Sequence, residues 1–164
     1  MTTPVAVIGC GLIGRAWTIV FARAGCPVRL WDAAPEVLES IPGRLRAMCD
    51  EAGEDPAILD RVTTHASMAE ALDGALWVQE NGPEKLDIKR AIYAELDRLA
   101  SPETILASSS SALVSSQFAE GLAGRGRILV AHPVNPPHVV PVVELCPSPD
   151  TTPETMDRAE TLMR

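Results

Sequence analysis

This sequence has little positive charge. Its 164 residues carry 14 Lys and Arg side chains against 22 Asp and Glu side chains, a formal net charge of −8. A surplus of acidic groups repels phosphate backbones and anionic lipid headgroups. We therefore expect neither nucleic acid nor a membrane surface among the partners of this protein.

Long apolar runs and the charge pattern typical of a leader segment are also missing from this sequence. No stretch approaches the roughly 18 consecutive apolar residues of a membrane span, and no basic segment opens the N-terminus. The four cysteines, Cys10, Cys26, Cys49 and Cys146, form no C-x-x-C pair and have no histidine at metal-ligand spacing. We expect four buried thiols, no metal site and a cytoplasmic location.

Length and composition favour a single globular domain. Hydrophobic residues make up 46% of the chain and charged residues 22%, which is typical of soluble folded proteins. A chain of this length buries enough surface to fold without disulfides or a structural metal. We predict that residues 1–164 form one domain.

Strand-like and helix-like patterns alternate along this domain. Short apolar runs typical of buried strands occupy residues 4–8, 28–31, 62–64, 75–79, 104–107 and 128–131. Helical patterns occupy residues 12–24, 35–52 and 85–99, and a capping box at Ser67 predicts a short helix that Gly74 ends. This order indicates a parallel sheet covered on both faces. The predicted fold class is α/β, with a doubly wound, mostly parallel sheet.

Two of the predicted helices allow more specific predictions. Within residues 35–52, Pro42 and Gly43 should kink or split the helix, because proline lacks the N–H that a helix interior needs. Residues 85–99 form the clearest amphipathic pattern. Its predicted inner side consists of Leu86, Ile88, Ile92, Leu96 and Leu99.

Proline dominates the last part of the chain. Seven of the 14 prolines follow residue 131, which excludes a long helix or a central strand there. Residues 142–145 still favour a short strand, and Thr152 followed by Pro153 is typical of a helix start. Because that helix continues to Arg164 without a cap, we expect the chain to be truncated before its last strand.

A complete G-x-G-x-x-G motif joins the first predicted strand to the first helix. Gly9 permits a tight turn, Gly11 lets the backbone approach a pyrophosphate, and Gly14 lets helix and strand pack closely. The N–H groups that open the helix, at Leu12 and Ile13, would face the phosphates. The motif alone is also compatible with an ordinary tight turn between a strand and a helix.

Asp32 strengthens the dinucleotide interpretation. It closes the second predicted strand, near the position where this motif places an acid that binds a ribose diol. A carboxylate there would repel a 2′-phosphate, and Ala33 and Ala34 offer no compensating arginine. The pattern therefore favours NAD over NADP, although a surface aspartate capping a strand would read the same way.

His132 and Glu144 are candidates for proton transfer. His132 follows an apolar strand, at the sheet edge where open α/β folds bind ligands, and Glu144 stands inside the predicted strand 142–145. A carboxylate paired with the imidazole would fix its tautomer and raise its basicity. A lone histidine before a proline is more often structural, so the pattern alone leaves both roles open.

A run of four serines, residues 108–111, follows another buried strand. It would serve as a helix-capping loop or bring hydroxyls to a substrate oxygen. The G-x-S-x-G motif of a serine nucleophile is absent. His65 and His138 have no obvious acidic partner and are expected to be surface or packing residues.

These motifs together resemble the NAD-binding domain of the 3-hydroxyacyl-CoA dehydrogenase family. The segments at 78–84 and 105–113 resemble family segments, and residues 131–145 are similar to the branch that contains λ-crystallin, an L-gulonate 3-dehydrogenase. The resemblance covers essentially the whole chain. It implies a Rossmann-type fold and a helical C-terminal domain that is absent from this chain.

The resemblance also implies roles for single residues. His132 would be the general base, Glu144 its orienting partner, and Ser111 the hydroxyl that contacts the substrate oxygen. Glu84, Lys89 and Asn135 match positions that contact the cofactor. The family often has Asn-Thr where this chain has Ser109 and Ser110, which leaves cofactor contacts there in doubt. Its catalytic asparagine would lie beyond residue 164, so we expect the chain alone to be inactive and the full-length protein to be a homodimer through the absent domain.

Three functions follow from this resemblance. The first is an NAD-dependent oxidoreductase that oxidises the 3-hydroxyl of a 3-hydroxyacyl-CoA or a related 3-hydroxy acid. The second is a dehydrogenase of a small acid, resembling L-gulonate 3-dehydrogenase or a carnitine dehydrogenase. The third, from another class, is a module that binds NAD or NADH without turnover.

Overall fold

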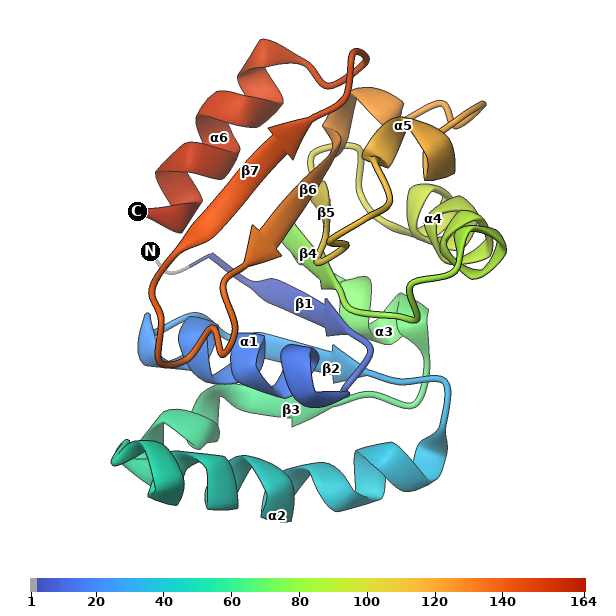
Figure 1. Ribbon diagram of the computed structural model, residues 1–164. Coiled ribbons are helices and arrows are strands. Elements are labelled where there is room, and N and C mark those ends of the chain that lie inside the picture. Colours follow the sequence, from blue (N-terminus) through green and yellow to red (C-terminus); the bar gives the residue numbers. More distant parts are fainter. Residues whose placement is uncertain (1–2) are drawn as a thin grey trace.

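The strands at the centre of this protein are buried on both faces. A computed structural model describes residues 3–164, and every residue of β1 (Val5–Ile8), β4 (Trp77–Glu80) and β5 (Ile105–Ser108) is buried (Figure 1). The remaining strands are β2 (Val28–Trp31), β3 (Val62–Thr64), β6 (Ile128–Pro133) and β7 (Val143–Pro147). Short continuous apolar runs form these strands because a sheet covered on both sides leaves no face for polar residues.

The sheet has the order β3-β2-β1-β4-β5-β6-β7. All neighbours are parallel except β6 and β7, which run antiparallel. The chain starts at the centre, builds outward to β3, and then crosses to β4 on the other side of β1. This arrangement confirms the predicted doubly wound fold and gives it a switch point between β1 and β4, the place where such sheets bind ligands.

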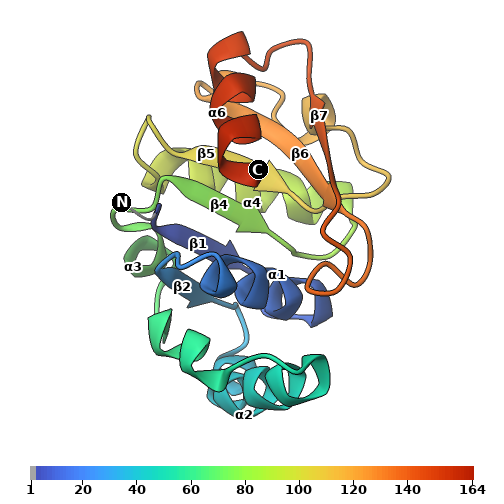
Figure 2. The same cartoon turned by 90° about the vertical axis from the view of Figure 1, so that its left-hand side faces the viewer.

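Six helices cover the sheet in two layers. They are α1 (Leu12–Arg23), α2 (Pro35–Ala52), α3 (Met68–Leu72), α4 (Leu86–Leu99), α5 (Ser115–Phe118) and α6 (Pro153–Met163), with 3-10 turns at Pro56–Arg61 and Arg125–Arg127. Val5 and Val7 of β1 pack in one core with α1, α2 and α6, whereas Ala6 and Ile8 pack in a second core with α3, α4 and α5. Figure 2 shows α1 and α6 on one side of the sheet and α4 on the other.

Pro42 does not split the second helix. Helix α2 continues from residue 35 to 52 and ends at Gly53, which has a left-handed conformation with a φ of +69°. Its buried side, which includes Ile41, Leu45 and Met48, packs in the core and offsets the hydrogen bond that proline cannot make. The expectation of a split helix is wrong because packing outweighs the local preference.

Two predictions about burial are also wrong. Ile88 is exposed, because the buried stripe of α4 runs through Lys89, Tyr93 and Leu96. Cys146 is exposed as well, whereas Cys10, Cys26 and Cys49 are buried as expected. Cys146 lies on β7, the edge strand of the sheet, where Glu144, Cys146 and Pro147 are exposed while Val143 and Leu145 pack against the core. Within residues 3–164, no helix has the length and apolar character needed to cross a membrane.

Candidate functional site

The G-x-G-x-x-G motif forms a tight elbow between β1 and α1. Gly9 has a φ of +88°, a backbone conformation that residues other than glycine rarely adopt. A Cβ atom on Gly14 would collide with the carbonyl oxygen of Gly9, whereas one on Gly11 would have no described atom within 4 Å apart from its own chain neighbours. Gly9 and Gly14 therefore serve the close packing of the elbow, and Gly11 leaves an open space in front of the helix.

The first turn of α1 faces this open space. Gly11 is the N-cap residue and supplies no side chain to cap the helix. Leu12 is exposed and Ile13 is partly buried. Their backbone N–H groups belong to the first turn of the helix and have no acceptor within it. Unpaired N–H groups and the positive end of the helix dipole attract phosphate oxygens. The space that a Cβ at Gly11 would fill is thus suited to a pyrophosphate.

Asp32 stands beside the elbow at the end of β2. Its Oδ2 accepts the backbone N–H of Cys10 at 2.7 Å, and its Oδ1 accepts that of Ala34 at 2.9 Å. These two bonds fix the carboxylate next to the glycine motif. A carboxylate at that place suits the hydroxyls of a ribose, so the elbow and Asp32 together fit a dinucleotide such as NAD. The same neighbourhood raises the pKa of the Cys10 thiol to about 12, through burial first and then through the charge of Asp32.

His132 and Glu144 meet across the antiparallel pair. They are directly opposite in the register of β6 and β7, and His132 Nδ1 lies 3.0 Å from Glu144 Oε2. Because a carboxylate only accepts hydrogen bonds, this contact places the hydrogen on Nδ1 and leaves Nε2 as the proton acceptor. The two side chains are 31% and 66% exposed, so Nε2 is within reach of a ligand.

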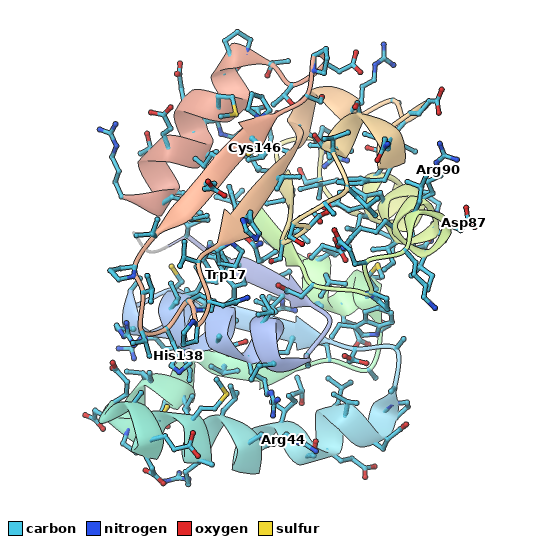
Figure 3. The ribbon with its side chains drawn as sticks, in the orientation of Figure 1. Trp17, Arg44, Asp87, Arg90, His138 and Cys146 are labelled. Atoms are coloured by element: carbon cyan, nitrogen blue, oxygen red, sulfur yellow. The ribbon has the colours of Figure 1, made fainter. Side chains whose placement is uncertain are left out.

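The His132–Glu144 pair forms one wall of a pocket of about 140 Å³. Val130, Cys146, Pro147 and residues 110–115 line the rest of the pocket. Cys146 lies on β7 (Figure 3). Ser111, the hydroxyl expected to contact substrate, lines the same pocket as His132. The three residues predicted to act in catalysis are therefore brought together.

The three residues expected to contact the cofactor away from the elbow have different surroundings. Lys89 is 1% exposed and its Nζ lies 2.9 and 2.8 Å from the two carboxylate oxygens of Glu80. Glu84 accepts hydrogen bonds from the serine loop, residues 110–113. Asn135 is exposed in the loop after β6. The ammonium group of Lys89 is thus occupied inside the protein.

A partly buried polar network joins the elbow to the His132 strand, and sequence reasoning did not find it. Ser109 Oγ accepts hydrogen bonds from Trp17 Nε1 (Figure 3) and Gln79 Nε2 and donates one to Asn81 Oδ1. Gln79 Nε2 also bonds the carbonyl of Ala131, the residue before His132. The available signal was Gln79 itself, a polar residue at the end of the otherwise apolar run at residues 75–79.

The chain matches a family model that describes the NAD-binding domain of 3-hydroxyacyl-CoA dehydrogenase, over residues 4–164. The λ-crystallin homolog of Bos taurus is 44% identical, over 98% of this chain and 53% of that protein. The L-carnitine dehydrogenase/betainyl-CoA thioesterase of Ruegeria pomeroyi is 35% identical, over 99% of this chain and 34% of that protein. The chain spans about half the length of the curated λ-crystallin relatives it matches.

Solved structures agree with these similarities. The 3-hydroxybutyryl-CoA dehydrogenase of Escherichia coli K12 superposes with a TM-score of 0.88 and 27% identity, over 99% of this chain and 36% of that chain. FadB2 of M. tuberculosis superposes with a TM-score of 0.91 and 27% identity, over 99% of this chain and 60% of that chain.

Proposed function

This chain belongs to the 3-hydroxyacyl-CoA dehydrogenase family, in its λ-crystallin branch. On that basis we propose that it is the NAD-binding domain of an NAD-dependent oxidoreductase. The proposed reaction oxidises the 3-hydroxyl of a 3-hydroxyacyl-CoA or a related 3-hydroxy acid to the 3-keto product. NAD, when bound, supplies the hydride acceptor. The residues of the chain then have to hold the dinucleotide, orient the substrate and remove one proton.

Three side chains around the pocket carry the proton step. His132 Nε2 takes the proton of the substrate hydroxyl as general base, since Nδ1 is bonded to Glu144. Glu144 holds the imidazole in that tautomer and stabilises the cation that forms. Ser111 donates a hydrogen bond to the substrate oxygen within the same pocket. In the reverse direction the imidazolium returns the proton to the 3-keto oxygen.

One observation carries this proposal. A histidine and a glutamate, 12 residues apart, lie 3.0 Å apart at the sheet edge that also bears the glycine elbow. Through Gln79, the strand of His132 is bonded to Ser109 and Asn81, and Asn81 packs against Gly9 of the elbow. A proton acceptor and a dinucleotide site that are rigidly joined in this way are what hydride transfer from a hydroxyl needs.

Two relatives favour a small acid over an acyl-CoA within this proposal. They are the λ-crystallin homolog, whose branch resembles L-gulonate 3-dehydrogenase, and the L-carnitine dehydrogenase/betainyl-CoA thioesterase. We therefore propose L-gulonate or a carnitine-type 3-hydroxy acid as the first substrates to try, with 3-hydroxybutyryl-CoA as the second candidate.

The decisive experiment is a rate measurement on the full-length gene product. Initial rates of NAD reduction are compared on L-gulonate, carnitine and 3-hydroxybutyryl-CoA, for the unmodified protein and for His132→Gln. We expect turnover with one of the small acids, and a loss of roughly 10²- to 10⁴-fold in His132→Gln, the usual contribution of a general base.

Other outcomes would redirect the proposal. A faster rate with 3-hydroxybutyryl-CoA would make the CoA thioester the substrate class. An unchanged rate in His132→Gln would remove its role as base. Tight NADH binding without turnover on any of the three acids would favour a module that binds NAD(H) without catalysis.

A further inference from the structure

We propose that Glu84 is a positioning residue for catalysis. Its carboxylate would hold the serine loop, residues 110–113, where Ser111 can reach the substrate oxygen. This inference rests on the proposed function, because it concerns the pocket that His132 lines. It gives Glu84 a different task from the cofactor contact that family resemblance implies.

The contacts of a single oxygen atom support this role. Glu84 Oε1 accepts the backbone N–H groups of Ser111 at 3.2 Å, Ala112 at 3.0 Å and Leu113 at 3.2 Å. The hydroxyl of Ser110 lies 2.5 Å from the same oxygen. Three successive amides that converge on one acceptor define the conformation of the whole loop.

The loop depends on this acceptor because it has little regular structure of its own. Residues 109–114 belong to no helix or strand, and α5 begins only at residue 115. Ser111 and Ala112 are exposed, so their N–H groups would otherwise bond water. Hydrogen bonds to an ionised carboxylate are roughly twice as strong as neutral ones.

Glu84 is ionised under ordinary conditions. Partial burial acts to raise its pKa, but hydrogen bonds from Ser110, Ala112 and Leu113 and the charge of Lys89 outweigh it and lower the pKa below the usual value. The lowered pKa is a consequence of the loop contacts and keeps the acceptor charged.

The backbone that presents Glu84 is itself anchored. Asn81, at the start of its segment, donates its N–H to the carbonyl of Ile8 at 2.7 Å, beside the glycine elbow. Lys89 Nζ donates to the carbonyl of Gly82 at 3.2 Å while paired with buried Glu80. A Cβ on Gly82 would lie 2.8 Å from Glu80 Oε1, so this segment is packed closely against the ion pair. The backbone before Glu84 is therefore held in place, and Lys89 Nζ also lies 3.8 Å from Glu84 Oε2.

The partners of Glu84 are also a wall of the pocket. Residues 110–113 all line the same pocket as His132 and Glu144. Removing the acceptor should therefore move Ser111 relative to His132 without touching either residue. The dinucleotide elbow, formed by residues 9–14 and Asp32, makes no hydrogen bond with Glu84 among the described residues.

Amide exchange tests the loop directly, without any activity. Hydrogen–deuterium exchange is followed by NMR at Ser111, Ala112 and Leu113 in the 164-residue chain, in Glu84→Ala and in Glu84→Gln. We expect exchange roughly tenfold faster at Ser111 and Ala112 in Glu84→Ala, as the loss of one hydrogen bond per amide implies. The change at Leu113 should be smaller, because its N–H also lies 2.9 Å from Ser110 Oγ. Glu84→Gln keeps a carbonyl acceptor without the charge and should fall between the two.

Kinetics of the full-length gene product tests the catalytic consequence. In Glu84→Ala we expect kcat to fall roughly 10²-fold, the effect of a misplaced catalytic group, while the Kd for NADH stays within about twofold. Glu84→Gln should recover most of the rate. The matched control is Glu95→Ala, which removes an exposed glutamate paired only with Arg98.

The two readouts separate failure of this inference from failure of the proposed function. Unchanged exchange at residues 111–113, or unchanged kcat in an active enzyme, overturns the positioning role. So does a Kd for NADH that rises tenfold with kcat unaffected, which would restore the cofactor contact. If the unmodified protein shows no turnover, the proposed function fails, and the exchange data still decide whether Glu84 holds the loop.

Discussion

Single glycines in the elbow differ in what surrounds them. A Cβ on Gly14 would collide with the backbone of Gly9, whereas a Cβ on Gly11 would meet no described atom within 4 Å apart from its own chain neighbours. Gly14 is thus needed for the packing of the protein itself. Gly11 is needed only for a ligand to approach, so a methyl group should affect stability at Gly14 and binding at Gly11.

We predict that two alanine substitutions affect different properties, one the stability of the protein and the other its binding of NADH. Gly14→Ala should lower the free energy of unfolding by about 1–3 kcal/mol, the cost of overpacking, which corresponds to a Tm lower by roughly 2–12 °C for a chain of this size. Gly11→Ala should leave the Tm nearly unchanged and weaken NADH binding about tenfold or more, a loss of about 1.4 kcal/mol. Thermal unfolding and NADH titration of both variants check this. A stable Gly14→Ala, or full NADH affinity in Gly11→Ala, would contradict it.

At the scale of elements, a buried ion pair joins β4 to α4. Lys89 of α4 is 1% exposed and Glu80 of β4 is fully buried, with their charged atoms 2.8 Å apart. Glu80 also accepts hydrogen bonds from Ser108 Oγ of β5 and from the N–H of Gly82. One carboxylate therefore links two strands, a helix and the segment that carries Glu84.

Breaking this pair should be more harmful than replacing it. Lys89→Met leaves the charge of Glu80 buried without its partner, and we expect a loss of about 3–5 kcal/mol in the free energy of unfolding. The double variant Lys89→Met/Glu80→Gln removes both charges and should lose less. Urea unfolding of both variants measures the difference. Equal losses in the single and double variants would show that the ion pair is not what joins the elements.

At the scale of the whole molecule, the strand order gathers every proposed functional group at one edge of the sheet. Gly9, Asp32, Asn81 and Ser109 follow the carboxyl ends of four parallel strands. His132 lies near the end of β6, and Glu144 lies near the start of the antiparallel β7, which places both at the same edge. The glycine motif and Asp32 both lie within this chain, while Glu144, which lines the pocket, is 66% exposed.

We therefore predict that the 164-residue chain binds NADH but turns over substrate slowly. The elbow and Asp32 are both present in this chain, so NADH should bind. A pocket open to water should orient the substrate poorly, so the turnover rate of the 164-residue chain should lie roughly 10²-fold or more below that of the full-length gene product. Fluorescence titration and initial rates on the same substrate check both parts. Binding of NADPH as tight as that of NADH would refute the role given to Asp32, and full activity of the chain would refute the second expectation.

The sequence alone determined those features whose cause is local. Apolar runs and helical periodicity depend on neighbouring residues, so they predicted the alternation of strands and helices and the doubly wound class. The glycine motif is contiguous, and its conformational reasons can be read from the residue types themselves. His132 and Glu144 were candidates from the pattern because they are only 12 residues apart, at the end of one short strand and within the next, but the pattern alone left their roles open and the family resemblance assigned them.

Only the tertiary structure decided the contacts between distant segments. Trp17 and Ser109 are 92 residues apart, and Glu84 reaches a loop 26 to 29 residues away, so no spacing rule could find either contact. Packing also overruled local preference, since α2 passes through Pro42 and the buried side of α4 runs through Lys89 instead of Ile88. Local patterns set which elements form, whereas the burial of polar groups depends on which elements meet, and that is settled only when the chain folds.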